Sequence, residues 1–494
     1  MWTPATLGCN IAGTRAVPAP GTLESQVRRS SLVMTLNKCS RPAICALVWL
    51  GIALATVSPA SASWKEKVLY SFQGIPDGSL PIGAVVFDPQ GNLYGATQDG
   101  GSDSCRSANQ CGTVFQLVPP AKKGDPWTET VLYVFKGNAS NDGTTPFGGL
   151  VIDSAGNLYG TTGYGGTGGC ILLGSKLGCG TVFELSPPPT QGGAWTETIL
   201  YSFKGGKDGY LPNGDLAFDG AGNLYGATAF GGGHGTACGD AFYQYCGTVF
   251  ELSPPSAKGG QWTEKVLHGF RGGKDGANPN GGLVLDSAGA VYGTTRIGGD
   301  LEGECSPNGC GAVFKLTPPV AKGGTWTEGV LHRFDGQDGA TPDAGVIFGG
   351  NGDLYGTAYA GATSGNGAVF SLAAPKGGSG PWKETVLCRF SDGNDGANPE
   401  GALIFDASGN LYGTTYVGSG GSLQGSVFRL KPPSKKWSRW TFSVIHGFLG
   451  PPDGDFPAAS LVDEEGDLYS TTQSGGTGSG CGYGGCGTVF EVKP

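Results

Sequence analysis

The run Asp153-Ser-Ala-Gly-Asn-Leu-Tyr-Gly-Thr-Thr162, which a Gly-rich stretch separates from Gly180-Thr-Val-Phe-Glu-Leu185, contains the pattern that predicts the fold. Both parts are short, rich in Val, Leu, Tyr, Phe and Thr, and bounded by Gly, Asn or Asp, which is typical of β-strands joined by turns. The Asp-x-x-Gly-Asn element indicates a hairpin, because Gly and Asn tolerate the positive φ of a tight turn. The segment therefore predicts strands.

The same pattern recurs in seven units, and each unit opens with a tryptophan. These tryptophans lie 56 to 68 residues apart, at Trp64, Trp127, Trp195, Trp262, Trp326, Trp382 and Trp440. A run such as Trp195-Thr-Glu-Thr-Ile-Leu-Tyr-Ser-Phe203 comes first, and an Asp-Gly-x-x-Pro motif and a short apolar run such as Leu150-Val-Ile152 follow. Self-similarity at this period indicates a repeat architecture.

Seven units of four strands, each too small to bury its own faces, favour a radial array. No segment of helical period follows residue 63. We therefore expect an all-β fold, a seven-bladed β-propeller of four-stranded antiparallel blades. The apolar run after the Pro is the inner strand A, Leu-Tyr-Gly-Thr-Thr is B, Gly-Thr-Val-Phe is C, and the Trp run is the outer strand D. The chain starts on D and ends on C, so residues 64–72 are predicted to complete the last blade.

Strand D carries Glu at the third position of six units, namely Glu66, Glu129, Glu197, Glu264, Glu328 and Glu384, whereas the last unit has Phe442. A charge at this position suits an exposed outer edge, where it would discourage edge-to-edge association.

Composition supports a folded chain in spite of its glycine content. Of 494 residues, 94 are Gly, and Gly and Pro together make up about a quarter. This share approaches that of low-complexity sequences. However, 38% of the residues are apolar and 10% are aromatic, which is enough side chains to form a hydrophobic core. We therefore expect the glycines at turns and in loops.

The N-terminus has the features of a targeting segment. Residues 1–33 are interpreted as an upstream extension or a mis-assigned start, and residues 34–62 as a signal peptide with a small-x-small cleavage site at Ala60-Ser61-Ala62. An uncleaved N-terminal anchor is the alternative. Residues 63–494 form the single propeller domain, which we expect to be secreted or periplasmic and monomeric, with no membrane insertion after cleavage.

Removing residues 1–62 takes away five of the 31 basic residues and one of the 40 acidic ones, which leaves a net charge of −13. An acidic chain of this kind is not suited to binding nucleic acid.

These repeats resemble the GloVer-type tandem repeat of secreted bacterial choice-of-anchor proteins. More distantly, they are similar to the repeats of NHL and two-component-regulator propellers. The likeness covers residues 64–494, and the fifth unit departs most, with Gly349 in place of the hairpin Asp and no cysteine pair. The resemblance implies a secreted repeat protein and brings no catalytic residues.

Ten cysteines pair locally in the B-to-C loops, and in an exported chain disulfides are the natural interpretation. The expected pairs are Cys105–Cys111, Cys170–Cys179, Cys238–Cys246, Cys305–Cys310 and Cys481–Cys486. Each would contribute roughly 2–3 kcal/mol if unstrained. Zinc is the competing interpretation, but two thiolates leave a tetrahedral site half empty. Cys388 is left over and is predicted to be a buried free thiol.

Antiparallel strands place the D-to-A and B-to-C loops on one face of the ring, which we call the loop face, and loops on a rigid ring are common binding sites. The aspartates of the Asp-Gly motifs have two interpretations, a carboxylate ring around the channel mouth or acceptors for N–H groups of their own turns. Seven equivalent copies favour the turn. These aspartates are Asp77, Asp142, Asp208, Asp275, Asp338, Asp395 and Asp453.

Aromatic residues that break the repeat in or beside the B-to-C loops are candidates for stacking on sugars, namely Tyr164, Phe230, Phe242, Tyr243, Tyr245 and Tyr416. His268, His332 and His446 stand where strand D has Tyr in other units and are interpreted as packing variants. Neither a G-x-S-x-G elbow nor an EF-hand loop occurs, so no catalytic residue, metal site or cofactor is predicted.

The first functional hypothesis is a non-catalytic module that binds an extracellular polysaccharide or protein through the loop face. The alternative is an extracellular enzyme of the same face, a glycan hydrolase or lyase or a metal-dependent lactonase-like activity. A purely structural surface protein is the third. We expect an asymmetric cluster of carboxylates with adjacent aromatics at the channel mouth to favour the enzyme, and a featureless mouth to favour a binding or scaffold role.

Overall fold

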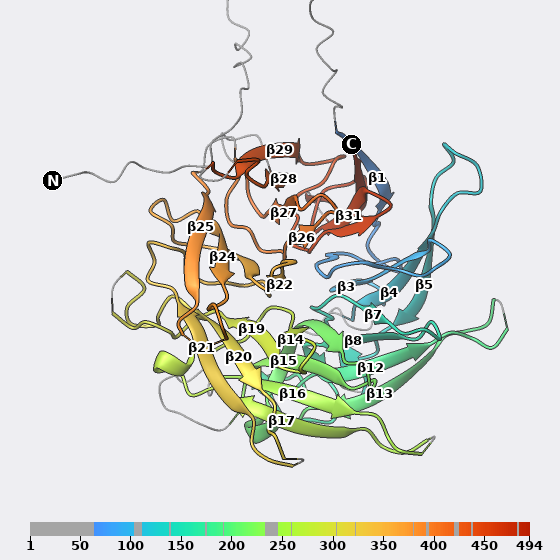
Figure 1. Cartoon of the computed structure of the whole chain (residues 1–494). Coiled ribbons are helices and arrows are strands. Elements are labelled where there is room, and N and C mark those ends of the chain that lie inside the picture. The colour runs from blue at the N-terminus through green and yellow to red at the C-terminus, as the bar shows by residue number, and fades with distance from the viewer. Residues whose placement is uncertain are drawn as a thin grey trace, which may run out of the picture.

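The computed structural model describes residues 64–494 except 103–110, 138–139, 173–174, 191, 233–245, 258, 303, 322, 379, 392–394, 419–423, 436–437 and 482–483. Seven four-stranded antiparallel sheets follow one another in chain order around a common centre (Figure 1). The predicted seven-bladed propeller is therefore confirmed.

Each blade contains one strand of each type. The inner strands A are β2 (Val86–Phe87), β7 (Val151–Ile152), β14 (Tyr210–Phe218), β18 (Val284–Leu285), β22 (Ile347–Phe348), β26 (Ile404–Phe405) and β30 (Val462–Glu464). The B strands are β3 (Leu93–Thr97), β8 (Leu158–Thr162), β15 (Leu224–Phe230), β19 (Val291–Thr295), β23 (Leu354–Ala358), β27 (Leu411–Thr415) and β31 (Asp467–Thr472).

The C strands are β4 (Thr113–Val118), β12 (Thr181–Ser186), β16 (Thr248–Ser253), β20 (Ala312–Thr317), β24 (Ala368–Ala373), β28 (Ser426–Lys431) and β32 (Thr488–Lys493). The outer strands D of blades 1 to 6 are β5 (Thr128–Val134), β13 (Thr196–Ser202), β17 (Thr263–Gly269), β21 (Thr327–Arg333), β25 (Lys383–Arg389) and β29 (Thr441–Gly447).

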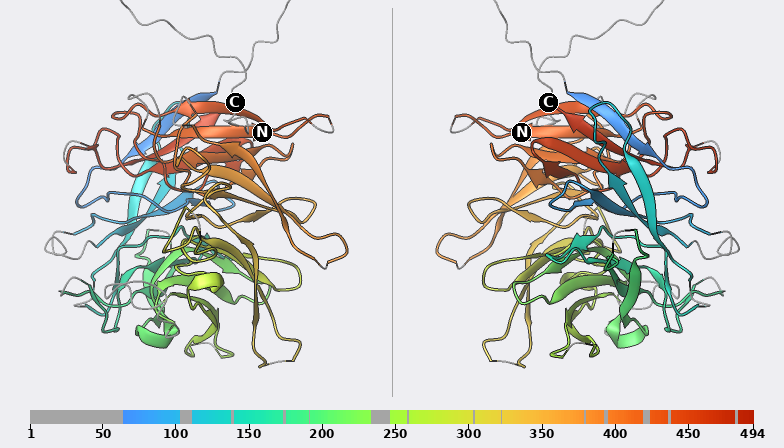
Figure 2. Two further views of the ribbon diagram at one scale, coloured as in Figure 1. Left: turned by 90° about the vertical axis from the view of Figure 1, so that its left-hand side faces the viewer. Right: turned by 90° about the vertical axis from the view of Figure 1, so that its right-hand side faces the viewer.

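The seventh blade takes its outer strand from the other end of the propeller. Strand β1 (Lys65–Ser71) pairs antiparallel with β32, and in Figures 1 and 2 the blue β1 lies beside the red strands of the last blade. Phe72, directly after β1, is fully buried. The predicted closure of the ring by residues 64–72 is thus confirmed.

Small elements lie in the connections of the loop face. They are β6 (Gly143–Thr144), β9 (Tyr164–Gly165), β10 (Ile171–Leu172), β11 (Ser175–Lys176) and the 3₁₀ turns η3 (Gly206–Asp208) and η4 (Gly273–Asp275). β6 pairs with β9, and bridges such as Ser79 to Asp99 join the D-to-A and B-to-C connections of other blades. The two kinds of loop therefore share one face, as expected. Among the described residues, none belongs to a helix with the length and apolar character of a membrane span.

Glycine lets the inner strands approach one another closely around the axis. A Cβ on Gly148 would lie 2.3 Å from the carbonyl oxygen of Gly214, and one on Gly83 would lie 2.5 Å from that of Gly148. Any side chain there would push neighbouring blades apart. Part of the glycine content thus belongs to the core of the ring rather than to loops.

Aromatic contacts hold one blade to the next. Trp195 of blade 2 packs against Tyr94 of blade 1 with ring centroids 6.0 Å apart, and Trp64 packs against Tyr412 at 5.9 Å. The Tyr hydroxyl at the middle of strand B also donates to the hairpin Asp, as from Tyr94 to Asp88 at 3.0 Å. Tyr94 and most of its counterparts are core residues, and their hydroxyls find partners where the core meets the hairpin.

Candidate functional site

A cavity of about 560 Å³ lies where the seven inner strands meet. Residues that follow the Pro of the Asp-Gly-x-x-Pro motif line it in every unit, together with Gln98 and Gln473 from the ends of B strands. The backbone N–H of Gln98 donates to the carbonyl of Leu80 in a D-to-A loop at 3.0 Å. The cavity therefore reaches the loop face, and we call this end the channel mouth.

Two positions at the channel mouth break the repeat. The position after the motif Pro holds Ile82, Phe147, Asn213, Asn280, Asp343, Glu400 and Ala458. The position after the last residue of Leu-Tyr-Gly-x-x holds Gln98, Gly163, Ala229, Arg296, Tyr359, Tyr416 and Gln473. Charged and tyrosine side chains gather in units four to six, whereas Ile82 and Phe147 make the opposite part apolar. The mouth is therefore asymmetric.

Asp343 and Arg296 form an ion pair across blades 4 and 5. Arg296 Nε lies 3.2 Å from Asp343 Oδ1, and the Arg side chain is half exposed whereas the Asp side chain is buried. Burial raises the pKa of Asp343 to about 6, although Arg296 and a hydrogen bond from Asn280 oppose the shift. Although Arg296 Nε lies close by, Asp343 Oδ1 is buried and accepts no hydrogen bond. This buried oxygen can accept a proton donor from a ligand.

Glu400 is the second carboxyl group of the mouth. Burial and the neighbouring Asp343 raise the pKa of Glu400 to about 7, and Arg296 opposes the shift. Glu400 in turn helps to raise the pKa of Tyr359 and of Tyr416, after burial. Two carboxyl groups with raised pKa values therefore share the site with two phenols. Such pairs can divide the roles of proton donor and anion.

Units three and four add amide side chains, and unit three adds the carboxyl group of Asp215, which also lines the cavity. Asn213 Nδ2 donates to Asn280 Oδ1 at 2.6 Å, between blades 3 and 4. Asp215 accepts the N–H of Gly149 in blade 2 at 2.6 Å, and burial raises its pKa. Asp215 therefore links the inner parts of blades 2 and 3 through this hydrogen bond.

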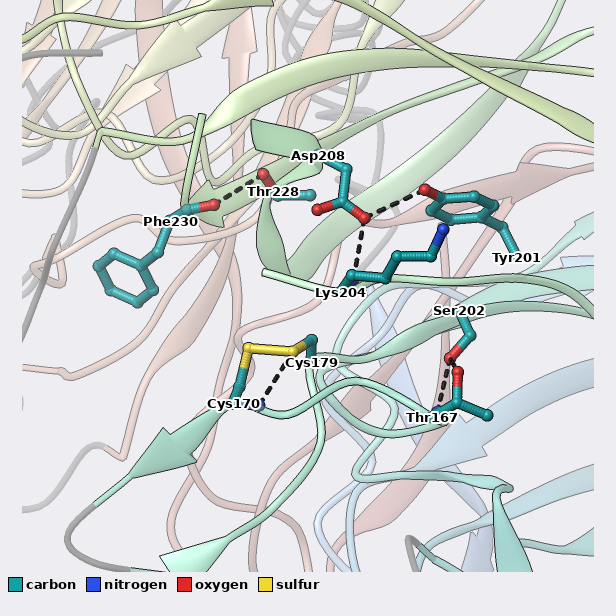
Figure 3. Close-up of a disulfide and its surroundings, with 9 residues drawn as sticks. All are labelled: Thr167, Cys170, Cys179, Tyr201, Ser202, Lys204, Asp208, Thr228 and Phe230. Carbon is teal, nitrogen blue, oxygen red and sulfur yellow. Dashed lines mark hydrogen bonds between the residues drawn. A yellow bond between two sulfur atoms is a disulfide. The ribbon is translucent and has the colours of Figure 1, made fainter. Parts of the chain in front are cut away.

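The seven Asp-Gly aspartates lie away from the cavity and serve their own loops. In Figure 3, Asp208 Oδ2 accepts the Tyr201 hydroxyl at 3.0 Å and the N–H of Lys204 at 2.9 Å. Asp77 and Asp142 repeat this arrangement, and in every unit the aspartate accepts a backbone N–H of its own loop. The aspartates are placed as the turn interpretation expects. None of the seven lines the channel mouth.

The histidines occupy the place of this tyrosine. His332 Nε2 lies 2.8 Å from Asp338 Oδ2, and His268 and His446 each lie 3.3 Å from the aspartate of their loop. Their interpretation as packing variants agrees with these contacts.

The expectation of exposed glutamates on strand D is wrong. In β1, Lys65 and Lys67 are exposed whereas Glu66 between them is half-buried, and Phe442, which replaces this Glu in β29, is 1% exposed. The Oε1 atoms of all six glutamates are buried without a hydrogen-bond partner. The side chain faces the neighbouring blade, because side chains alternate along a strand and the flanking residues take the solvent side.

Each of these glutamates approaches an Asp-Gly aspartate of the neighbouring blade. Burial, followed by the charge of Asp77, raises the pKa of Glu129 to about 7. Glu197 with Asp142, Glu264 with Asp208, Glu384 with Asp338 and Glu66 with Asp453 behave alike. The pKa of Glu328 is raised as well. Burial beside a second carboxyl group in these inter-blade acid pairs thus favours the protonated form of the glutamates.

The aromatic candidates from the sequence differ in their distance from the channel mouth. Tyr416 donates to Gln473 Oε1 at 3.2 Å and stacks on Phe456, so it belongs to the channel mouth. Tyr164 packs against Phe147, which lines the cavity. Phe230, the last residue of β15, packs against Tyr210, the first residue of β14, and Figure 3 draws it in the neighbourhood of the Cys170–Cys179 disulfide. Phe242, Tyr243 and Tyr245, as well as His234, lie outside the described residues.

The model of the Gloeobacter/Verrucomicrobia repeat matches residues 53–242, 168–379, 234–443 and 303–494, which together span the whole propeller. The chain belongs to this family. The match confirms the GloVer resemblance. A search of curated proteins found no relative of this Gloeobacter/Verrucomicrobia repeat protein.

Solved structures resemble the repeat protein only distantly. The aldose sugar dehydrogenase of Streptomyces coelicolor is 13% identical, with 87% of this chain and 98% of that chain covered and a TM-score of 0.39. A gluconolactonase of Xanthomonas campestris is 14% identical, with 63% and 78% covered and a TM-score of 0.34. PorZ, a surface component of the type-IX secretion system of Porphyromonas gingivalis, is 14% identical, with 86% and 48% covered and a TM-score of 0.45. Similarity this low says nothing about activity.

Disulfides cross-link the B-to-C loops of the repeat protein. Cys170–Cys179, Cys305–Cys310 and Cys481–Cys486 are bonded as expected. Cys111 and Cys246 are also disulfide-bonded, whereas their predicted partners Cys105 and Cys238 lie outside the described residues. Cys388 is disulfide-bonded too, so the prediction of a free thiol is wrong. The prediction failed because it paired each cysteine only with a near neighbour in the sequence, and Cys388 has none.

Proposed function

We propose that this repeat protein is exported and binds a saccharide unit of an extracellular polysaccharide at the channel mouth. The observation that supports the proposal is the loss of repeat symmetry at the two mouth positions of units four to six. A scaffold would gain nothing from burying the Asp343 carboxyl group and half-burying that of Glu400 beside a cavity, because burial of such groups costs free energy unless they are paired. A ligand with many hydroxyl groups can satisfy them.

Each part of the mouth suits a sugar. Asp343 Oδ1, which is buried without a hydrogen-bond partner, and Glu400 can accept hydroxyl protons, and Arg296 can donate to a ring or hydroxyl oxygen. Tyr359 and Tyr416 are half-buried phenols beside Glu400, and Phe147 with Ile82 supplies an apolar wall. Convergent polar groups in a largely preformed cavity are typical of a small-ligand site. The disulfides agree with an oxidising, extracytoplasmic location.

A glycan array probed with the chain from residue 63 tests the proposal. We expect selective binding that Glu400→Gln lowers at least tenfold, because the neutral amide cannot supply a carboxylate acceptor. Asp125→Asn is the matched control, since Asp125 is exposed in a C-to-D connection, on the opposite face. Equal loss in both variants, or binding of proteins but of no glycan, would reject the saccharide site.

Proton transfer to the bound glycan is the second candidate function, and it is favoured by two neighbouring carboxyl groups, Asp343 and Glu400, whose pKa values are both raised toward neutrality. A carboxyl group with a pKa near 7 can act as general acid while its neighbour stays anionic. The asymmetric mouth with two adjacent tyrosines is the arrangement that was expected to favour an enzyme. Incubation with the glycans that bind should release shorter products. Glu400→Gln should abolish release, and absence of any product would leave binding as the function.

A further inference from the structure

A second polar cluster lies far from the channel mouth, where the closing strand meets blade 6. Glu66 in β1, His446 in β29 and Asp453 in the following D-to-A loop each offer one ligand atom, and these three atoms lie within 4.8 Å of one another. All three side chains are half-buried. Among the residues that the structure describes, this is the single such group of three His, Cys, Asp or Glu side chains.

The three atoms that face one another lack hydrogen-bond partners. Glu66 Oε1, His446 Nε2 and Asp453 Oδ1 are each buried and unsatisfied. His446 Nε2 lies 3.3 Å from Asp453 Oδ1, and the other oxygen, Asp453 Oδ2, accepts the N–H of Leu449 at 3.1 Å, which orients the carboxylate. Buried polar atoms without a hydrogen-bond partner are uncommon in a folded protein, and here three of them belong to side chains whose ligand atoms lie within 4.8 Å of one another.

Equivalent positions of other units show what distinguishes this cluster. In units with Tyr, the hydroxyl donates to the aspartate, as from Tyr133 to Asp142 at 2.8 Å. His332 instead hydrogen-bonds Asp338 at 2.8 Å. Neither arrangement brings three ligand atoms together. His268 and Asp275 repeat the 3.3 Å contact, and Glu328 Oε1 beside them is also buried without a hydrogen-bond partner. Among the described residues, only Glu66, His446 and Asp453 bring all three ligand atoms within 4.8 Å of one another.

We propose that Glu66, His446 and Asp453 bind one divalent transition-metal ion of the Zn²⁺ class, which anchors the strand that closes the ring. One imidazole and two carboxylates form a ligand set that such ions accept, with water in the remaining position. Ligand atoms about 2.0–2.2 Å from zinc lie roughly 3.3 Å apart in a tetrahedral site, so small rotations of these side chains complete the geometry. The ion links β1, β29 and the loop before β30.

Isothermal titration calorimetry with ZnCl₂ tests the site on residues 63–494 after dialysis against a chelator. We expect about one ion per chain and a rise in the thermal midpoint that the chelator reverses, because a ligand that binds only the folded state stabilises it. Substitution of Co²⁺ should give the visible absorption of a low-coordinate N/O site. Absence of Zn²⁺ uptake would overturn the proposal.

Two matched variants separate this site from adventitious binding. His446→Tyr introduces the residue that Tyr70, Tyr133 and Tyr201 supply at the same position, so the fold is expected to survive while Zn²⁺ affinity falls at least 100-fold. His332→Tyr is the control and should keep wild-type affinity. Glu66→Gln provides a second removal of one ligand should His446→Tyr not fold. Equal affinity in the three variants and the wild type would refute the site.

Discussion

Lys65 in the first strand of the ring lies opposite Lys493 in its last strand. The register continues through Val68 with Phe490 to Ser71 with Thr488, and a bulge lies between Val68 and Tyr70. The two ends of the domain therefore form one sheet, and the backbone hydrogen bonds between β1 and β32 close the ring.

Removal of residues 64–72 should destabilise the propeller far more than loss of an ordinary terminus, because it exposes the edge of β32 and the pocket of Phe72. Phe72→Ala alone is expected to cost about 3–5 kcal/mol. Denaturant unfolding measures both effects. Addition of a synthetic peptide of residues 64–72 should restore part of the lost stability, and a truncated chain as stable as the intact one would contradict closure by β1.

Stability should rise as the pH falls from 8 to 5. The strand D glutamates have pKa values raised to about 7, as in Glu129 and Glu197, from an ordinary value of 4.5. Between these values the folded chain binds more protons than the unfolded chain, so the free energy of unfolding decreases with increasing pH. Scanning calorimetry at several pH values should show the highest midpoint near pH 5.

Glu129→Gln is the control for this pH dependence. The amide is neutral at every pH, so the variant should gain stability at pH 8 and change little at pH 5. A thermal midpoint that peaks at pH 8 in the wild-type chain would contradict the inter-blade acid pairs.

Gly148→Ala should destabilise the ring, because the new methyl group would lie 2.3 Å from the carbonyl oxygen of Gly214 in the next blade. Overpacking of this kind costs about 1–3 kcal/mol or more. Gly220→Ala is the matched control: it also lacks a positive φ, and no atom lies within 4 Å of the point that its Cβ would occupy. Chemical denaturation of the two variants should therefore give clearly different midpoints.

The Asp-Gly turns should depend on their hydrogen bonds. Tyr201→Phe removes one donor to Asp208 and is expected to cost about 1 kcal/mol, whereas Asp208→Ala leaves the Tyr hydroxyl and the N–H of Lys204 unsatisfied and should cost about 2–3 kcal/mol. Urea unfolding of the two variants compares these costs. Equal stability of the wild type and Asp208→Ala would argue against a structural role for these aspartates.

Arg296→Gln should raise the pKa of both carboxyl groups at the channel mouth. The Arg charge opposes the upward shifts of Asp343 and Glu400, so its removal favours the neutral acids. NMR titration of the side-chain carboxyl carbons should place the pKa of Glu400 above 7 in the variant. Unchanged titration curves would show that the ion pair does not act on the site.

Sequence alone determined the repeat, the strand order, the closing strand and the local disulfides of the propeller. These features follow from short-range patterns: alternating strand residues, turn residues at fixed offsets and cysteines a few positions apart. The turn role of the Asp-Gly aspartates was predictable for the same reason. Their backbone partners lie only a few residues away in the sequence, as Lys204 does for Asp208.

Tertiary structure decided the channel mouth and the inter-blade acid pairs. Arg296, Asp343 and Glu400 come from three units and meet only because the ring directs the same position of every unit to one axis. The burial of Glu66 and its counterparts depends on how outer strands of adjacent blades face each other. A single unit contains no information about either, because each contact joins residues of different units or depends on the closure of the ring.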